Sequence, residues 1–567
     1  MKNIFRTKRG EGILRNEAPR PKGRGFPVRR FLYIVPLDPA LKGGACGAHA
    51  GQKGLVLPLA LIFLVILSIM GIAAIMTSTS TTALFGGLRR GDEALYYAEA
   101  GIEAAKNLLA RDIPNLDSVY ANSGQLDTLP GTITYGNGSY TVRIVNDEGE
   151  TDSNVETNGI YIIRSTGRAS DTSKTLEVVV LNFSRFFYFT EYEEAPLIAT
   201  TLPWEDRFVF FRTGDDLDGP VHSNHALHIA GNPVFHDLAS SSAVPFKLSG
   251  AAADSAIFLG GTNWSRTISL PVGDDDHFGT PDDLKTVLIG ATAKGRIIDT
   301  FDTGTGRAWD YRVHFRGDRG SEVDIYKKDS QDDDPVNSRW TFVETLTIGS
   351  SFNGVVYFVG GGAIHAGGRI QTTGTATEVG KLRSSGTEST VKGRWTICSA
   401  MTANLADINL VLPAGEIQIE GDIKYVGHYT GTSDPFPVEG DTQHPIEGLL
   451  GLVSANNVVI KSNGEDVNNT IRDNGLTIHA SIMATSNDNA TFNVETALLE
   501  QMPGSANRQL NLLGGIIQVR RGVVGVFDAA GLVFGFDKNY KYDRRLRYMS
   551  PPSFPLALNL RVRSWKE

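Results

Sequence analysis

The most prominent feature of the hydrophobic pattern is one long uncharged run. From Leu55 to Met76 no side chain carries a charge, and the next charged residue is Arg89. About 20 residues of α-helix span the roughly 30 Å hydrocarbon core of a bilayer, so the run is long enough to cross a membrane. It exceeds the roughly 7–15 apolar residues of an ordinary signal peptide. The run therefore predicts a transmembrane helix, with a buried helix of a soluble core as the alternative.

Apolar positions continue beyond the run at helical spacing. After the polar TSTSTT tract, one apolar stripe follows spacings of three, four and seven residues. Its members are Leu84, Leu88, Leu95, Ala98, Ile102, Ala105 and Leu109. Pro114 ends the pattern, because proline interrupts a helix. We predict one helix over residues 55–113, apolar all round in its first half and with a single apolar face in its second half.

A strand pattern replaces the helical one from about residue 130. Residues 139–147, 159–169 and 174–183 alternate or run apolar, with Gly- and Asp-rich breaks between them. They predict a small antiparallel sheet within residues 114–200 that packs on the exposed half of the helix. An independent small β domain is the alternative.

The rest of the chain contains many short apolar strands closed by Gly or Asn turns. Such units recur at irregular intervals of about 20–35 residues, which favours stacked parallel coils, a β-solenoid, over an elaborated β-sandwich. We expect the body to start over residues 201–261, to carry an inserted β unit over 262–350, and to continue over 351–567. The fold class is α+β and mostly β: a long N-terminal helix, a small antiparallel sheet, and a large β-solenoid-like or β-sandwich body.

Charge divides the chain into two parts. Residues 1–54 form a leader with 12 Lys/Arg and three acidic residues, a net charge of +9, whereas the whole chain carries −9. Basic flanks of membrane helices stay on the cytoplasmic side, so we expect a cytoplasmic leader and an acidic, extracytoplasmic body. The acidic body also argues against a nucleic-acid partner, because phosphate contacts need clustered Lys and Arg.

The chain has two cysteines, Cys46 and Cys398, so it can form at most one intramolecular disulfide. Cys46 lies in the leader, so removal of the leader would leave Cys398 alone. We therefore expect packing and backbone pairing, rather than a disulfide framework, to hold the body together.

The start of the apolar run resembles a known family. A basic QKG at residues 52–54, the apolar run, and then LRRGDEALYYAEAGIEAAKNLL are similar to the N-terminal region of type IV pilin-like proteins, and most closely to the PilX-type N-terminal domain. The family signature [YF]-x-A-E-A-G matches Tyr97, Glu99 and Gly101 with the alanines between them. The resemblance covers about residues 51–110. It implies cleavage by a prepilin peptidase after Gly54, which would make Leu55 the mature N-terminus.

Leu59 departs from the pattern of the pilins that build the filament shaft. Those proteins carry a glutamate at the fifth mature position, where it meets the terminal amine of a neighbouring subunit, and this chain carries Leu59. Loss of that carboxylate removes a specific assembly contact, so the resemblance implies a minor pilin. The leader is long for a prepilin, which fits either a start placed too far upstream or a genuine cytoplasmic leader.

The body resembles a bacterial domain of unknown function, DUF4900, which is found behind pilin-like N-termini. The similar stretches are residues 219–224, 231–233 and 538–565. That family has no established activity, so the resemblance implies architecture only.

One acidic loop suggests calcium. Asp274, Asp276 and Asp282, with Gly279 between them, follow a D-x-D-x-x-G-x-x-D spacing that can converge oxygen ligands on Ca²⁺. Phe278 occupies a position where a third oxygen ligand is usual, so a solvated acidic loop remains the alternative. We predict no other cofactor.

Two further clusters could carry chemistry. His222, His225, His228 and His236 could hold a transition metal, but residues three apart point to opposite faces of a strand and do not converge without a turn. Glu416, Glu420 and Asp422 could serve a polysaccharide lyase or glycosidase, which needs paired carboxylates in a groove. Neither pattern rises above chance, so we predict no enzyme.

Together these features predict a minor pilin-like component of a type IV pilus or related filament, displaying a large β body for assembly or adhesion. Its expected partners are a prepilin peptidase, other pilins or pseudopilins, the membrane, and a surface polysaccharide or another substratum. The expected location is the bacterial inner membrane, with a surface filament as the alternative. The alternative function is an enzyme of the cell envelope, anchored by an uncleaved helix and acting on polysaccharide.

Overall fold

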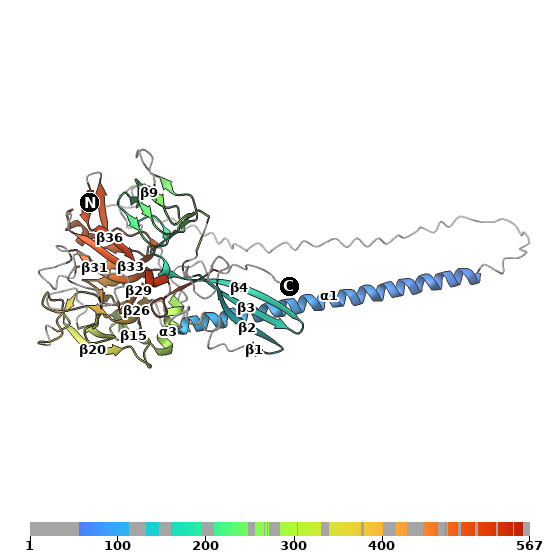
Figure 1. Cartoon of the computed structure of the whole chain (residues 1–567). Helices are drawn as coiled ribbons and strands as arrows, with labels where there is room; N and C mark the ends of the chain where they lie inside the picture. The colour runs from blue at the N-terminus through green and yellow to red at the C-terminus, as the bar shows by residue number, and fades with distance from the viewer. Residues whose placement is uncertain are drawn as a thin grey trace, which may run out of the picture. The chain divides into compact units, whose positions relative to one another are not determined.

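The computed structural model describes the helix and most of the β body (Figure 1). The described residues are 56–112, 132–146, 160–195, 209–247, 256–265, 267–268, 270, 284–302, 304–329, 339–375, 379–400, 415–427, 446–462, 471, 475–485, 489–504, 508–528, 531–547 and 549–559. Contacts divide the chain into two compact units, residues 1–80 and 81–567.

Helix α1 (Val56–Asp112) is a single element of 57 residues, which confirms the predicted long N-terminal helix. In the part of α1 that belongs to the first unit, hydroxyl side chains form hydrogen bonds with the backbone of the helix. The hydroxyls of Ser68 and Thr77 donate to carbonyls four residues earlier, at 2.8 Å in each case. This back-bonding satisfies hydroxyl groups on an otherwise apolar stretch of helix.

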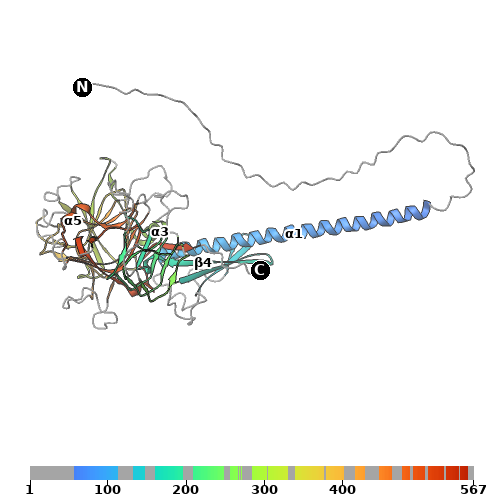
Figure 2. The same ribbon diagram turned by 90° about the horizontal axis from the view of Figure 1, so that it is seen from above.

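An antiparallel sheet follows the helix, with the order β1-β2-β3-β4-β37. The strands are β1 (Thr132–Tyr135), β2 (Gly138–Asn146), β3 (Ile160–Ala169), β4 (Thr172–Asn182) and β37 (Leu556–Asn559). The first four form a meander in which each strand pairs with the next, and β37 adds the end of the chain to β4. Both views show β4 beside α1 (Figure 1, Figure 2).

The largest sheet has eleven strands, and ten of them lie in the order β14-β11-β8-β5-β33-β31-β29-β26-β21-β15, with β36 on β33. Every pair in this sheet is parallel. The strands are β5 (Tyr188–Tyr192), β8 (Val221–Ser223), β11 (Ala239–Ser241), β14 (Thr262–Asn263), β15 (Arg296–Asp299), β21 (Val355–Val359), β26 (Gly393–Ala400), β29 (Gly448–Ser454), β31 (Leu476–Ala484), β33 (Gln509–Arg520) and β36 (Asp537–Tyr542).

We call residues 188–263 the first arm of the body. Its chain passes repeatedly through three parallel sheets, the large one and two of three strands each. The small sheets contain β6 (Phe211–Arg212), β9 (His228–Ala230) and β12 (Phe246–Lys247), and β7 (Asp216–Leu217), β10 (Val234–Phe235) and β13 (Ile257–Phe258). Val221 pairs with Ala239 and Asp216 with Val234, a repeat of 18 residues in both sheets. Successive turns therefore stack in register.

We call residues 296–520 the second arm. It alternates between the large sheet and a seven-stranded sheet with the order β20-β19-β18-β22-β27-β30-β32. Those strands are β18 (Tyr311–Phe315), β19 (Glu322–Lys328), β20 (Trp340–Thr347), β22 (Ile364–Ala366), β27 (Ile417–Ile419), β30 (Val458–Ile460) and β32 (Phe492–Val494). From β18 through β22, β27 and β30 to β32 the pairs are parallel.

The remaining elements connect or cover the two arms. Helices α3 (Lys285–Lys294) and α5 (Thr496–Glu500) lie before and within the second arm. Short hairpins and ladders are formed by β16 (Phe301–Asp302), β17 (Arg307–Ala308), β23 (Arg369–Ile370), β24 (Thr387–Glu388), β25 (Thr390–Val391), β28 (Lys424–Tyr425), β34 (Gly525–Asp528) and β35 (Gly531–Gly535).

The expected inserted unit at 262–350 is not separate in its described strands. Strand β14 belongs to one end of the large sheet and β15 to the other, and β18–β20 extend the seven-stranded sheet. The strands that suggested a separate unit, β18, β19 and β20, pair antiparallel in chain order. Parallel pairing of β18 with β22 joins that hairpin group to the body.

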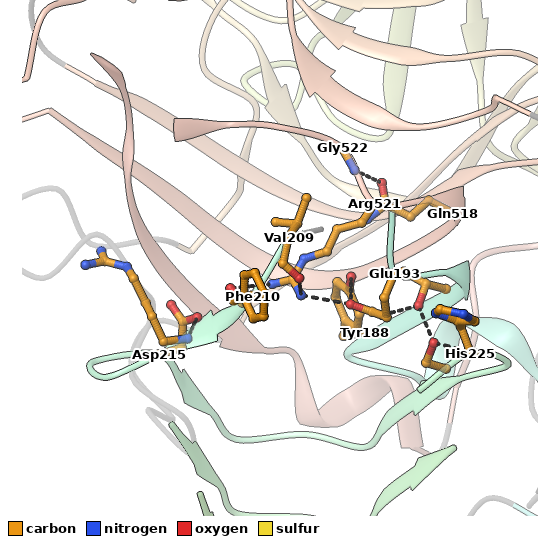
Figure 3. Close-up of polar contacts among 12 residues, drawn as sticks. Tyr188, Glu193, Val209, Phe210, Asp215, His225, Gln518, Arg521 and Gly522 are labelled. Carbon is orange, nitrogen blue, oxygen red and sulfur yellow. Dashed lines mark hydrogen bonds and ion pairs between the residues drawn. The ribbon is translucent and has the colours of Figure 1, made fainter. Parts of the chain in front are cut away.

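The two arms meet where β33 pairs with β5, and we call this junction the seam. Ile516 pairs with Tyr188 and Gln518 with Thr190, so the end of the second arm lies beside the start of the first. The Arg521 guanidinium lies just past β33, with its Nη1 2.8 Å from Glu193 Oε2 (Figure 3). The two side chains are 5% and 0% exposed, so this ion pair is buried.

Other groups at the seam form hydrogen bonds and a ring contact with Arg521 and Glu193. Its Nη1 donates to the Val209 carbonyl at 3.0 Å, and its Cζ lies 3.9 Å from the centre of the Phe211 ring. The Thr190 hydroxyl donates to the second carboxylate oxygen of Glu193. A buried ion pair is tolerated when its remaining donors and acceptors are satisfied, and the seam meets that condition.

The C-terminal segment crosses the outer face of the large sheet. The Thr396 hydroxyl donates to the Pro552 carbonyl at 2.6 Å, and Arg394 Nε donates to the Ser550 carbonyl at 3.2 Å. Phe554 lies over Gly451, where a Cβ would be 2.7 Å from its ring. We call residues 544–555 the strap, because they lead from the body to β37 and so to the antiparallel sheet.

Arg521→Met tests the importance of the seam. It would leave the Glu193 carboxylate buried without its cation, and we expect a loss of about 3–5 kcal/mol in the free energy of unfolding. Urea unfolding of the full-length protein measures it. Arg520→Met is the matched control: Arg520 pairs with Glu194 at 3.6 Å where both are partly exposed, and we expect a loss below about 1 kcal/mol. Equal losses for the two variants would contradict the importance given to the seam.

Candidate anchoring and assembly site

The first half of α1 presents apolar side chains on every side. Leu57, Phe63 and Ile69 are 76%, 62% and 61% exposed within the chain. Among the described residues, α1 is the one helix long and apolar enough to cross a membrane, with a mean hydropathy of 2.9 in its most apolar 18-residue window. None of that window is buried, so this is not the core helix of a soluble domain. Such a surface needs a bilayer or other apolar helices around it.

Leu59 belongs to this surface. Its side chain is 57% exposed, among other apolar residues of α1. The described residues 57–76 of the helix contain no charged side chain. The first half of the helix therefore offers packing surface and no charged group for pairing.

The second half of α1 docks on the antiparallel sheet through small side chains. Ala94, Ala98 and Ala105 are 0% exposed and Ile102 is 3% exposed, a spacing of three or four residues that forms one face of the helix. Alanine lets the helix backbone lie close to the sheet. We call this buried face of the helix the dock.

Two glycines show how close the dock is. A Cβ on Gly101 of the helix would lie 2.2 Å from Ser165 Oγ and 3.0 Å from the Val142 side chain. A Cβ on Gly167 of β3 would lie 2.1 Å from the Ala94 carbonyl oxygen. A Cβ on Gly167 would collide with backbone atoms of the helix, so this position requires glycine unless the helix moves, whereas a Cβ on Gly101 would force the side chains of Ser165 and its neighbours to shift.

The signature residues divide between the two sides of the helix. Tyr97 lies over the β1–β2 turn, where a Cβ on Gly138 would be 2.1 Å from its ring. Ala98 and Gly101 face β3, whereas Glu99 is exposed. Tyr97, Ala98 and Gly101 thus serve helix–sheet packing, and Glu99 is available to a neighbour.

The start of the predicted apolar stripe is not part of the dock. Leu84 and Leu88 are 63% and 58% exposed, and the buried face begins at Ala94, which the stripe omitted. Heptad spacing therefore predicted the buried face of the helix correctly only where the helix packs on the sheet. Gly167 was also missed, although an isolated glycine within a strand is a known sign of close backbone approach.

Several predicted positions lie outside the described residues. These are the processing residues Gly54 and Leu55, the leader with Cys46, and the calcium candidates Asp274, Asp276 and Asp282. Cleavage and calcium binding therefore stay predictions. Cys398 is described, and it is buried and unbridged.

The histidines do not converge on one point. In the part of the chain that the structure describes, no group of three or more His, Cys, Asp or Glu side chains could hold a metal ion. His222 Nδ1 lies 2.8 Å from Ser240 Oγ, whereas His236 pairs with Asp216. The rings of His225 and His228 touch, and burial lowers the pKa of His228 to about 4, so it is neutral near pH 7.

Glu420 belongs to a buried ion cluster rather than to an open groove. Its carboxylate oxygens lie 2.8 Å from Arg312 Nη2 and 2.8 Å from His365 Nδ1, and its side chain is 1% exposed. Burial alone would lower the pKa of His365, but the carboxylates of Glu420 and Asp310 outweigh it and raise that pKa to about 9. Burial alone would raise the pKa of Glu420, but His365 and Arg312 hold it well below its usual range.

The other two carboxylates of that segment also have structural contacts. Asp422 accepts a hydrogen bond from the Thr477 amide at 2.8 Å and lies 2.8 Å from Lys424 Nζ. Glu416 is half-buried, and its carbonyl accepts from the Ile364 amide. The charges of Glu420 and Asp422 are therefore used in holding adjacent strands, and Glu420 is inaccessible to a polymer.

Comparison with known proteins gives one family match, in the helix. The model of the PilX N-terminal family matches residues 53–103, which hold the apolar half of α1 and most of the dock. No curated protein matches. The DUF4900 resemblance of the body stays a prediction.

One solved structure with similarity to this chain is the competence-associated pilin ComZ from Thermus thermophilus. It covers 84% of this chain and 97% of that chain at 12% identity, with a TM-score of 0.31. A similarity this low carries no argument about this chain.

Gly101→Ala tests the dock. The added methyl would collide with Ser165 and Val142, and we expect a loss of about 1–3 kcal/mol in the free energy of unfolding. Gly91→Ala is the matched control, because a Cβ there would meet only Lys174 Cε at 3.9 Å. That change should stabilise the helix by up to about 1 kcal/mol. Thermal unfolding of both variants gives the comparison, and stabilisation by both would rule out the close dock.

The ion cluster predicts a pH dependence. Because the folded-state pKa of His365 is raised to about 9 from an ordinary 6.5, its contribution to stability is full below pH 6.5 and is lost as the pH rises through 9. We expect His365→Gln to flatten the fall in urea midpoint between pH 6.5 and 9. A parallel fall in the wild type and the variant would contradict this assignment.

Proposed function

We propose that this chain is a minor pilin-like subunit of a type IV pilus or related filament, inserted in the inner membrane by α1 and displaying its β body outside. The observation that carries the proposal is the coincidence of three features in one helix. The family match at 53–103 spans both the exposed apolar half of α1 and most of the buried face by which α1 forms the dock.

Each half of α1 has its own role in this proposal. The apolar half holds the subunit in the bilayer before assembly and packs against other pilins afterwards, since both environments accept an uncharged helix surface. The dock half packs against the antiparallel sheet through its small side chains. Glu99 is exposed on the side away from the sheet and is available to a neighbouring subunit.

The accessory role rests on Leu59. A shaft subunit would use a carboxylate at the fifth mature position to pair with the terminal amine of its neighbour, and Leu59 offers no such pair. The proposed subunit is therefore present in the filament in few copies. Its large body serves assembly, or adhesion to a surface polysaccharide or other substratum.

Processing gives the most direct test of this function. We expect a prepilin peptidase to cut after Gly54, so that mass spectrometry of the membrane-extracted protein finds Leu55 at the N-terminus. Gly54→Leu should leave the leader attached and abolish recovery of the protein in sheared filaments. Gly51→Leu, three residues earlier in the same GQKG segment, is the control and should be cut normally. An intact leader on the wild-type protein would overturn the proposal.

A further inference from the structure

The apolar surface of α1 extends beyond the uncharged run at 55–76. Leu84, Phe85 and Leu88 are 63%, 64% and 58% exposed within the chain, and we call residues 84–88 the collar. A Cβ on Gly86 or Gly87 would meet nothing within 4 Å, so no described part of the antiparallel sheet covers the collar there. Three large apolar side chains exposed together on so short a stretch indicate an apolar surrounding rather than water.

The threonine- and serine-rich tract between the run and the collar is polar in composition, but its hydroxyls bond to the helix. The hydroxyls of Thr77 and Thr79 donate to carbonyls four residues earlier, at 2.8 and 3.0 Å. A hydroxyl that is bonded to its own helix does not need water as a partner, and such serines and threonines occur in membrane helices. The tract is therefore compatible with a place inside the bilayer.

Charge and the antiparallel sheet begin together, directly after the collar. Four of the five residues 89–93 are charged, namely Arg89, Arg90, Asp92 and Glu93. Arg90 Nη1 lies 3.2 Å from Asp171 Oδ1 in the turn between β3 and β4, so the end of the sheet lies level with this charge cluster. Charged side chains at the ends of membrane helices lie in the headgroup layer, which makes the cluster a natural boundary.

The length of the uncharged helix fits a complete bilayer. Residues 57–88 contain no charged side chain. At 1.5 Å per residue this stretch is about 48 Å long. A bilayer with its headgroup layers is about 40–45 Å thick, and membrane helices tilt by about 20° on average. A boundary just after Leu88 therefore uses the whole stretch, whereas a boundary at Met76 would leave the collar in water.

We propose that the extracytoplasmic boundary of the bilayer lies at residues 88–90, with the collar in the lipid interface and the β3–β4 turn against phospholipid headgroups. The partner is lipid because the collar continues the exposed apolar surface by which α1 enters the membrane. Arg89, whose side chain is 82% exposed, lies at the level of the lipid phosphates. This inference rests on the proposed membrane insertion and adds its depth.

Cysteine accessibility of the full-length protein in phospholipid liposomes tests this boundary. Single cysteines are introduced in a Cys46→Ser background, and Cys398 stays unreactive because it is fully buried. A membrane-impermeant maleimide is added outside liposomes that contain few chains per lipid. The four variants are Ile66→Cys in the run, Ser80→Cys in the polar tract, Leu84→Cys in the collar and Tyr96→Cys beyond the charge cluster.

We expect Tyr96→Cys to label at least tenfold faster than the other three variants. Fast labelling of Ser80→Cys and Leu84→Cys with a protected Ile66→Cys would place the boundary near Met76; it would overturn this inference and leave the anchor intact. Fast labelling of Ile66→Cys would overturn membrane insertion itself. Protection of Leu84→Cys that disappears when the protein is diluted further into lipid would mean that a second chain covers the collar, which also contradicts the proposal.

Quenching by spin-labelled lipid headgroups tests the place of the sheet. A fluorophore on Ser173→Cys, an exposed position just after the β3–β4 turn, should be quenched several-fold more than one on Glu103→Cys. Glu103 is exposed on the same helix, 13 residues beyond Arg90 and thus about 20 Å farther from the proposed boundary. Equal quenching at the two positions would show that the turn does not contact the headgroups and would overturn that part of the proposal.

Discussion

The body depends on the parallel pairing of β33 with β5. The first arm runs outward from β5, whereas the second arm starts at the far end of the same sheet and returns to β33. Among the described strands, the two arms pair at the seam alone, through Ile516 with Tyr188 and Gln518 with Thr190. Without it, two long strands would each expose a row of unpaired amides and carbonyls. Arg521 and Glu193 fix the register there, because a one-residue slip would separate a buried cation from its carboxylate.

The seam also determines how the body is connected to the helix. The chain enters the body at β5, directly after β4 of the antiparallel sheet, and it returns to that sheet through the strap and β37. The body is thus held from the middle of its largest sheet by two segments of chain. Two attachments restrain the body more than one would, because each limits its movement relative to the antiparallel sheet. The dock continues this path to the helix, where Gly101 and Gly167 leave no gap.

The sequence predicts local elements well and their partners poorly. The uncharged run identified α1, and alternation identified β2, β3 and β4, because both signals depend on neighbouring residues. Strands such as β29 and β31 are buried on both faces and show no alternation that could specify a register. Arg521 and Glu193 are far apart in sequence, so spacing could not reveal their pairing. For the same reason the sequence could not show that Glu420 is buried beside Arg312, which is distant from it in sequence.

The central claim is that two arms distant in sequence form one cooperative body through the seam. Amide hydrogen exchange of the full-length protein, read by mass spectrometry, measures it most directly. The account predicts that amides of β8 in the first arm and β29 in the second arm exchange with the same opening free energy, that of the whole body. Fast exchange throughout residues 209–247, with full protection kept at 448–484, would show an independent first arm and would contradict the account.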